Sequence, residues 1–333
     1  MKGKWFVAIF GCALIAATGW GAAGQCAEDS GLVPVRIAVI GSSGQDEVPY
    51  AIQQFGLDKK YGLAMEVIDY AAPGQQYTMY RSGAADVSAG NFVDLLRQRK
   101  AGLGLQAFHS FQGYSNLIVT KPESPIKTFA DLRGKKVGEF GTTFLDWLIL
   151  RAAGKKAYDL DLGTDATLVQ GAPPLLNQFL AKGEVDATLQ FSSLTFGPLL
   201  KGNQRVVADI SGVMRAAGFD PDAFYLHWQV TEAWIKAHPD GVGKLSAMID
   251  DAYSKLDSDD DLWPPLAQKI GITDPKIMAA YRDEARKIDN PPYNKTLIRP
   301  TQALIDSIVA IAGEAAVGVT QVDPAAFLFP TGS

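Results

Sequence analysis

The chain has 333 residues, 47% of them hydrophobic and 20% charged, with a formal net charge of −5 at pH 7. A mildly acidic chain without a run of basic residues is not expected to bind nucleic acid or an anionic membrane. Roughly 300 residues bury about three quarters of the surface that their unfolded chain exposes, so a stable core does not require disulfides.

The first 30 residues have the three-part pattern of a secretory signal peptide. Lys2 and Lys4 form a positive start, residues 5–18 are mostly apolar, and small residues follow as far as Ala27. The apolar stretch is shorter than the roughly 20 residues that a membrane-spanning helix needs. We therefore predict a signal peptide over residues 1–27, cleaved after Gly24 or after Ala27, and a periplasmic mature protein. An uncleaved anchor is the alternative.

The two cysteines bear on lipid anchoring and on disulfides. Cys12 lies in the apolar stretch and would be lost with the signal peptide. Cys26 follows Gln25, whereas a lipoprotein signal has a small residue at that place, so a lipid anchor is not expected. The mature chain keeps at most one cysteine and can form no internal disulfide. Loss of Lys2 and Lys4 with the signal takes the formal charge from −5 to −7.

From residue 35 the chain alternates short apolar runs with amphipathic stretches. In the first series we predict strands over 35–40, 64–69, 86–89 and 103–108, and helices over 48–55, 74–82 and 92–100. Repeated β-α-β units at this spacing favour a mostly parallel sheet that is covered by helices on both faces.

A second series follows a strand predicted over 115–120. It has predicted strands over 135–139, 166–169, 187–189 and 225–230, helices over 143–155 and 174–182, and a helical tail with tracts at 241–256 and 301–313. The pattern predicts two α/β lobes and a tail. If 115–120 and 225–230 both cross between the lobes, the chain forms a hinge over a cleft, and such clefts are favoured ligand sites.

Four short stretches carry a resemblance to one family. Residues 126–138 read IKTFADLRGKKVG and resemble the stretch that opens the second lobe of type II periplasmic solute-binding proteins. Residues 183–187, GEVDA, and 81–87, RSGAADV, resemble the entries into a strand in the two lobes of that family. Residues 55–63, FGLDKKYGL, are similar to a motif of its nitrate, sulfonate, taurine and thiamine-precursor binding branch.

The resemblance spans about residues 35–325 and implies an exported receptor that closes on a small-molecule solute and delivers it to the permease of an ABC importer. It implies the type II periplasmic binding protein fold, an α/β fold of two Rossmann-like lobes joined by a two-strand hinge, with a C-terminal helical tail on lobe 1. We expect a monomer that meets the membrane through the permease alone. The expected domains are lobe 1 over 33–114 plus 231–325, lobe 2 over 121–224, and hinge crossings at 115–120 and 225–230.

Candidate ligand contacts lie at the corners after the predicted strands, because open α/β sheets bind ligands at the carboxyl ends of their strands. In the first lobe these are Ser42, Ser43, Gln45, Gly90, Asn91, His109 and Tyr114. In the second lobe and on the return crossing they are Gln190, Phe191, Ser192, Tyr225, His227 and Trp228. Helix capping, a structural histidine and packing between the lobes are the alternatives for these residues.

The corner Gly141-Thr142-Thr143 lies between a predicted strand and a predicted helix. The resemblance places it at the edge of the cleft where the family seats the polar head of its ligand. Two hydroxyls and free backbone N–H groups suit a sulfonate, a carboxylate or a nitrate, and a threonine that caps the helix is the alternative. No arginine lies at the predicted corners to grip an inorganic dianion in bidentate fashion.

These features predict a binding protein for a small organic solute: a sulfonate, taurine or a related organic acid, or alternatively a planar heterocycle of the thiamine-pyrimidine or riboflavin type. A sensory receptor that presents its ligand to a membrane kinase would have the same fold and is a second alternative. An enzyme is not expected, because the cysteine-rich motif of the related pyrimidine-forming branch is absent. His227 and His238 lack the spacing of a metal-binding pair, so neither a metal nor a cofactor is expected.

Overall fold

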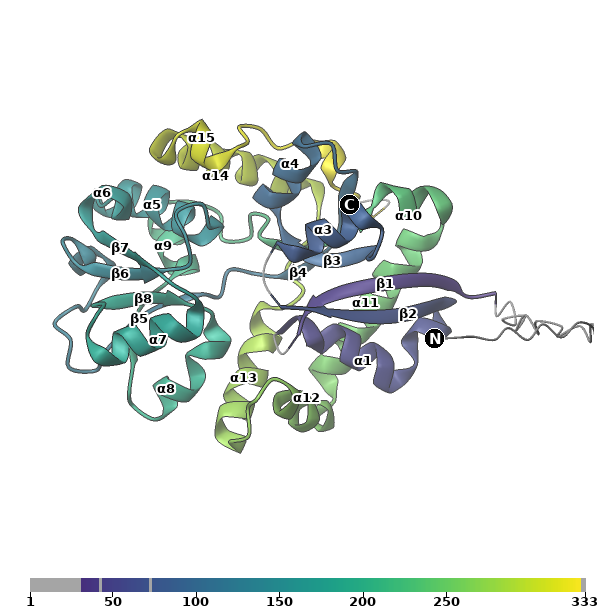
Figure 1. Ribbon diagram of the computed structural model, residues 1–333, viewed down its shortest axis with the longest axis horizontal. Coiled ribbons are helices and arrows are strands. Elements are labelled where there is room, and N and C mark those ends of the chain that lie inside the picture. The colour runs from purple at the N-terminus through teal and green to yellow at the C-terminus, as the bar shows by residue number, and fades with distance from the viewer. Residues whose placement is uncertain (1–30, 42–43, 72–73, 331–333) are drawn as a thin grey trace, which may run out of the picture.

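The computed structural model describes residues 31–41, 44–71 and 74–330. These residues form two α/β units, each built around a five-stranded sheet (Figure 1). The expected signal peptide over 1–27, with Cys12 and Cys26, lies outside the described residues. No helix in the described ranges is both long enough and apolar enough to cross a bilayer.

The first sheet has the strand order β2-β1-β3-β10-β4. β1 pairs in parallel with β2 and β3, whereas β10 lies antiparallel between β3 and β4. Its strands are β1 (Val33–Ile40), β2 (Leu63–Tyr70), β3 (Val87–Asn91), β4 (Leu105–Gln112) and β10 (Leu226–Thr231).

The second sheet repeats this arrangement with the order β7-β6-β8-β5-β9. β6 pairs in parallel with β7 and β8, and β5 lies antiparallel between β8 and β9. Its strands are β5 (Leu117–Thr120), β6 (Lys136–Glu139), β7 (Thr167–Gln170), β8 (Ala187–Gln190) and β9 (Arg205–Asp209). β5 follows the first unit in the chain, and β10 follows the second unit. In each sheet the antiparallel strand is thus the first strand after the chain crosses from the other unit. The segments expected as crossings overlap β5 and β10, each of which lies inside a sheet.

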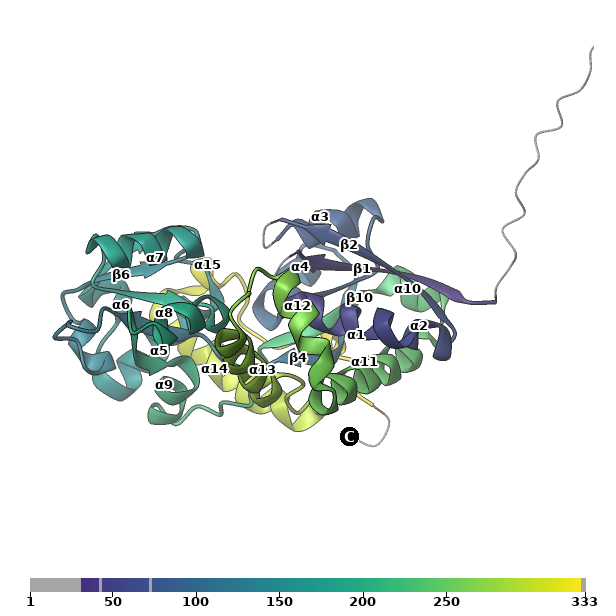
Figure 2. The ribbon, with the colours of Figure 1, turned by 90° about the horizontal axis from the view of Figure 1, so that it is seen from below.

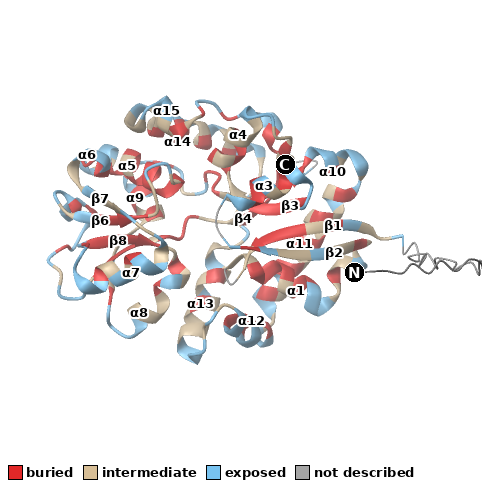
Figure 3. Cartoon of the chain, viewed as in Figure 1, coloured by how far each residue is buried: buried red, intermediate tan, exposed pale blue. Residues whose placement is uncertain are grey.

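Helices cover both faces of the first sheet. They are α1 (Glu47–Phe55), α2 (Leu57–Lys60), α3 (Gln75–Ser82), α4 (Phe92–Lys100), α10 (Glu232–Ala237), α11 (Gly241–Ser258), α12 (Trp263–Lys269) and α13 (Pro275–Ile288). α11 buries Leu245, Met248, Ile249 and Ala252, the spacing of one helix face, against the core that it shares with α1 and the sheet. Figure 3 shows buried residues along both sheets and in α5.

The remaining helices belong to the second unit and to the end of the chain. They are α5 (Leu145–Tyr158), α6 (Leu162–Asp165), α7 (Pro173–Lys182), α8 (Phe196–Leu200), α9 (Ile210–Ala216), α14 (Ile298–Ala312) and α15 (Glu314–Val317). α14 contacts α5, and its Leu304, Ile305 and Ile308 join one hydrophobic cluster with residues of α4 and α5. The tail thus reaches both units, as Figure 1 shows along its upper edge. The predicted fold class is confirmed, and this contact of α14 with the second unit adds to it.

Candidate functional site

A cavity of about 790 Å³ is lined by residues of both units. Its walls come from the carboxyl ends of β1, β4, β6, β7 and β8, from the segments that follow them, and from α13. This is the edge at which open α/β sheets bind ligands. The volume lies in the range of about 300–1,000 Å³ that is typical of small-molecule sites.

Three phenylalanines form an aromatic wall on the second unit. The ring centroid of Phe140 lies 5.0 Å from that of Phe144 and 4.7 Å from that of Phe191. Phe140 follows β6, Phe144 precedes α5 and Phe191 follows β8, so the ends of two neighbouring strands bring the rings together. Rings at tilted and edge-on angles leave aromatic surface for a flat ligand to contact.

The opposite wall combines α13 with the start of α1. Tyr281 of α13 donates a hydrogen bond from its hydroxyl to Oε1 of Glu47, and both residues are buried and line the cavity. Glu47 is in turn hydrogen-bonded to the carboxyl of Asp289. Burial raises the pKa of Glu47, and burial together with the charge of Glu47 holds the pKa of Asp289 well above its ordinary value.

α13 also meets the second unit. The ring of Tyr281 lies edge-on to that of Phe196 on α8, at a centroid distance of 6.1 Å. Figure 2 shows α13 lying beside the second unit, where it contacts α8. The helix therefore contributes to the ligand cavity and to the contact between the units.

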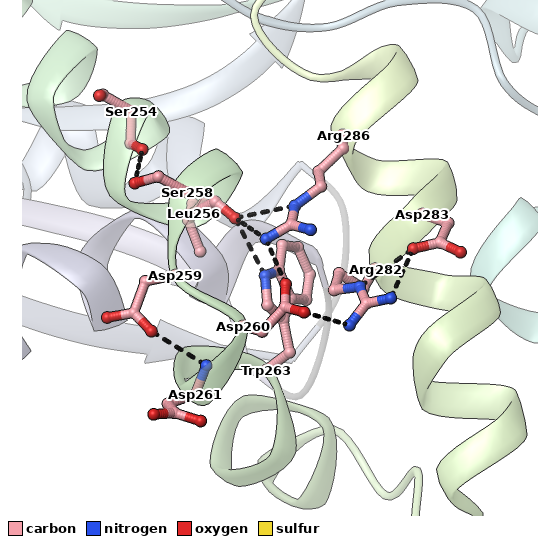
Figure 4. Close-up of polar contacts among 10 residues, drawn as sticks. All are labelled: Ser254, Leu256, Ser258, Asp259, Asp260, Asp261, Trp263, Arg282, Asp283 and Arg286. Carbon is pink, nitrogen blue, oxygen red and sulfur yellow. Dashed lines mark hydrogen bonds and ion pairs between the residues drawn. The ribbon is translucent and has the colours of Figure 1, made fainter.

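The outer face of α13 is fixed to the first unit by an arginine network (Figure 4). Arg282 and Arg286 both form ion pairs with Asp260, at 3.0 and 2.9 Å. Arg286 also donates to the backbone carbonyl of Leu256 and lies over the ring of Trp263. These contacts position α13. The other face of the helix carries Tyr281 into the cavity.

A buried carboxyl, Asp146 at the start of α5, lies behind the cavity wall. Its Oδ2 accepts hydrogen bonds from the side-chain amide of Asn116 and, at 3.1 Å, from the hydroxyl of Tyr225. Asn116 and Tyr225 both line the cavity. Burial raises the pKa of Asp146 to about 6, although both hydrogen bonds favour its charged form. Glu139 is also fully buried nearby, and burial holds its pKa well above the ordinary value.

The cavity carries no positive side chain among the described residues that line it, whereas Glu47 and Glu284 are acidic. Among the described residues, no group of three His, Cys, Asp or Glu side chains is placed to hold a metal ion. The lining is therefore aromatic, polar and acidic, which suits a neutral or cationic ligand better than an anion.

Four of the residues predicted as contacts line this cavity: Gln45, Phe191, Ser192 and Tyr225. Gln45 also accepts a hydrogen bond from the backbone N–H of Ile40, at 3.0 Å. Ser42 and Ser43 lie outside the described residues.

Three further predicted residues lie outside the cavity lining, and two of them, Tyr114 and Gln190, support its wall from behind. Tyr114 stacks on Tyr225 at a centroid distance of 4.2 Å, and Gln190 donates to the carbonyl of the cavity residue Pro173 at 2.8 Å. Gly90 lies against the side chain of Gln229, since a Cβ at this position would approach its Nε2 to 2.1 Å. Tyr114 and Gln190 thus support the cavity without lining it.

The remaining first-unit candidates make structural contacts. Asn91 caps α4 by accepting from the N–H of Asp94 at 2.8 Å. His109 stacks on Tyr253, and Trp228 is fully buried and donates to the hydroxyl of the same Tyr253 at 3.4 Å. His227 is buried, and its burial lowers the pKa to about 3.

The Gly141-Thr142-Thr143 corner lies beside the cavity. Thr142 and Thr143 are exposed, and none of the three residues lines the cavity. α5 begins two residues later, with Phe144 as its N-cap and without a side-chain cap. Here the corner places its flanking aromatic residues, Phe140 and Phe144, in the wall and directs its hydroxyls to solvent.

Sequence reasoning missed Glu47, Asn116, Phe140, Phe144 and Tyr281. The two phenylalanines flank the corner that was singled out, so an extension by one residue on each side would have found them. Glu47 lies only two residues after the predicted contact Gln45. No local signal marked Tyr281, because its helix reaches the cavity from a point far along the chain.

Comparison with known proteins places this fold in a wider class. The alkanesulfonate-binding protein SsuA from Xanthomonas axonopodis pv. citri, bound to MOPS, matches with a TM-score of 0.72 at 18% identity, over 90% of this chain and 99% of that chain. The aliphatic sulphonate-binding protein SsuA from Escherichia coli matches with a TM-score of 0.69 at 18% identity, over 86% and 89%. The fold is that of periplasmic binding proteins.

The family follows from the sequence itself. The family model described as NMT1/THI5 like matches residues 50–259. The chain belongs to the NMT1/THI5-like family. A comparison with curated proteins found no match.

Proposed function

We propose that this chain is the solute-binding protein of an ABC importer, that it acts in the periplasm, and that it captures its solute in the cavity between the two units. The observation that carries the proposal is an aromatic-walled cavity of about 790 Å³ that both units line at the carboxyl ends of their strands. A solute held there bridges the two units, so binding favours the state in which both walls contact it.

The chemistry of the cavity favours the planar-heterocycle class among the two predicted ligand classes. The rings of Phe140, Phe144 and Phe191 offer flat apolar surface on one wall. Glu47 on the other wall and the absence of a basic side chain among the described lining residues disfavour a sulfonate head. The sulfonate class draws its support from the fold neighbours, whose names state that they bind sulfonates.

A thermal-shift and calorimetry screen of residues 28–333 tests the proposal. The panel contains taurine, alkyl and aryl sulfonates, nitrate, aromatic carboxylates, a thiamine-type aminopyrimidine and riboflavin. A ligand at 100 times its dissociation constant stabilises the folded protein by about 2.7 kcal/mol, which is readily detected. Recovery of the unchanged ligand by mass spectrometry after prolonged incubation separates a receptor from an enzyme.

Matched variants locate the site. Phe140→Ala with Phe191→Ala removes most of the aromatic wall and should weaken binding of the hit at least about tenfold, because each ring contact is worth about 1 kcal/mol. Phe55→Ala is the control, since Phe55 is an exposed phenylalanine on α1 that does not line the cavity. Equal affinity of the wild type and the double variant would place the ligand elsewhere.

The transport role has its own test. Deletion of the gene should abolish growth on the identified solute at low concentration, and the wild-type gene should restore it. Normal uptake in the deletion strain, together with loss of a transcriptional response to the solute, would instead support the sensory receptor.

A further inference from the structure

Several cavity side chains direct their hydrogen-bond donors at carboxyls that are buried, those of Asp146 and Glu47, or half-buried, that of Asp289. Asn116 and Tyr225 donate to Asp146, Gln112 donates to Asp289, and Tyr281 donates to Glu47. All four donor residues line the cavity. The pattern recurs on both walls, so it concerns the cavity as a whole.

On the second unit, Asp146 fixes the orientation of the Asn116 amide. Both Asn116 and Asp146 are buried, and Nδ2 of Asn116 donates to Oδ2 of Asp146 and, at 3.3 Å, to the hydroxyl oxygen of Tyr225. An ionised carboxyl can only accept, so the amide must turn its NH₂ group toward it. At pH 7.5 Asp146 is largely ionised, since its pKa is about 6.

The carbonyl oxygen of Asn116 is therefore the polar atom left for a ligand. Within the described chain this Oδ1 makes no hydrogen bond, and it is not among the fully buried atoms that lack a partner. It is consequently reached by solvent, and the cavity is the space that Asn116 lines. Tyr225 donates its hydroxyl hydrogen to Asp146, so its oxygen can only accept a hydrogen bond from a ligand.

On the first unit, Gln112 also directs its side-chain amide donor at a carboxyl, that of Asp289. Nε2 of Gln112 donates to Oδ1 of Asp289 at 3.2 Å, which leaves Oε1 of Gln112 as the acceptor. Tyr281 donates its hydroxyl hydrogen to Oε1 of Glu47.

We propose that Asp146 and Asp289 are positioning residues that turn the Asn116 and Gln112 carbonyl oxygens into the cavity, so that the site selects flat solutes with N–H or O–H donors at two separated points. The inference rests on the proposed function and names the solute class within it. Gln170, Ser192 and Ser193 also line the cavity and retain both donor and acceptor capacity, so they adapt to the rest of the solute.

The test uses matched pairs of heteroaromatic probes that differ in one donor. The pairs are 4-aminopyrimidine with 4-methoxypyrimidine, and adenine with 6-methoxypurine. Affinities at pH 7.5 are measured by calorimetry with residues 28–333. The wild type should bind the amino member of at least one pair about tenfold or more tightly than the methoxy member, because the methoxy group accepts but cannot donate.

Asp146→Asn is the decisive variant. The new amide can donate to Asn116, which allows the Asn116 amide to turn over and present its NH₂ group to the cavity. The preference for the amino member should fall by about tenfold or reverse. Asp161→Asn is the control, because Asp161 is also a buried carboxyl that accepts hydrogen bonds, from Arg151, but does not line the cavity. It should keep the wild-type preference.

A spectroscopic measurement checks the orientation without a ligand. In protein labelled with ¹⁵N-asparagine, the side-chain signals of Asn116, assigned through Asn116→Asp, should be shifted and protected from exchange in the wild type and in Asp161→Asn. They should lose that protection in Asp146→Asn.

Each outcome bears on one of the two proposals. Equal binding of amino and methoxy probes, an unchanged preference in Asp146→Asn, or binding of sulfonates without any amino heteroaromatic would overturn the donor-selective inference while leaving the receptor function standing. Failure of every solute in the wider panel as well would refute the receptor function itself.

Discussion

Asp146→Asn should make the protein more stable at neutral pH. The carboxyl of Asp146 has a pKa of about 6 in the folded protein, against 3.8 for the exposed group. At 1.36 kcal/mol per pKa unit, this difference corresponds to about 3 kcal/mol by which ionisation at pH 7.5 disfavours the folded state. An asparagine has the same shape and carries no charge, so the variant is relieved of this cost.

The sign of the pH dependence follows from the raised pKa. The wild-type carboxyl is protonated in both states below pH 3.8, so the advantage of the variant should vanish there. Between pH 3.8 and about 6 the unfolded state loses its proton first, and the advantage should grow as the pH rises. We expect a gain of about 3 kcal/mol at pH 7.5 and roughly half of that at pH 5, with a rise in Tm of roughly 5 °C at pH 7.5.

Guanidinium chloride unfolding, followed by tryptophan fluorescence at pH 7.5, 6 and 5, measures this directly. Asp161→Asn is the comparison, because Asp161 has a lowered pKa: burial opposes its charge, but hydrogen bonds from Arg151 and from the N–H of Gly163 outweigh burial. That variant should lose stability at neutral pH. The reasoning is wrong if Asp146→Asn is no more stable than the wild type at pH 7.5, or if its gain in unfolding free energy is the same at every pH. Either result would mean that ionisation of Asp146 does not destabilise the folded protein.

Three further changes test other parts of the structure. His227→Gln should flatten the pH dependence of unfolding. Because the pKa of His227 is about 3 in the folded protein, the wild type should lose about 2 kcal/mol of unfolding free energy between pH 7 and pH 5, and the variant should not. Parallel pH profiles of the two proteins would contradict this. Gly154→Ala should cost about 1–3 kcal/mol in urea unfolding, since the added Cβ would lie 2.6 Å from Phe129; a neutral effect would mean that this helix contact yields freely. Thr142→Ala with Thr143→Ala should leave the calorimetric affinity unchanged, because both are exposed and outside the cavity lining; weaker binding would show that this corner reaches the solute once the units close.

The side chains on the two walls of the cavity indicate the same kind of ligand. Sulfonate-binding neighbours share the fold at 18% identity, and a shared fold does not fix the residues of a binding site. In this chain the described lining combines three phenylalanines with carboxyl-supported acceptors. The two-unit fold thus supplies the cavity, and the side chains at its walls set the chemistry that a ligand in it would meet.

The sequence by itself determined the fold class and indicated the sheet edge along which the cavity lies. The alternation of apolar runs and amphipathic stretches is a local property, and it predicted the strands that became β1, β2, β6 and β8 to within a few residues. The short strand β9 was missed in this pattern. The position of the ligand edge also followed, because the carboxyl ends of parallel strands share one edge of a sheet.

Only the tertiary structure decided which side chains at that edge meet. A corner shows which residues are near a strand end, but the helix start decides which of them turn inward, and here Phe140 and Phe144 line the cavity while Thr142 and Thr143 face solvent. Contacts between distant segments are still less visible: Tyr281 meets Glu47 across 234 positions of the chain. Such a contact depends on how α13 packs against the rest of the first unit, and packing between distant segments leaves no periodic signal in a single sequence.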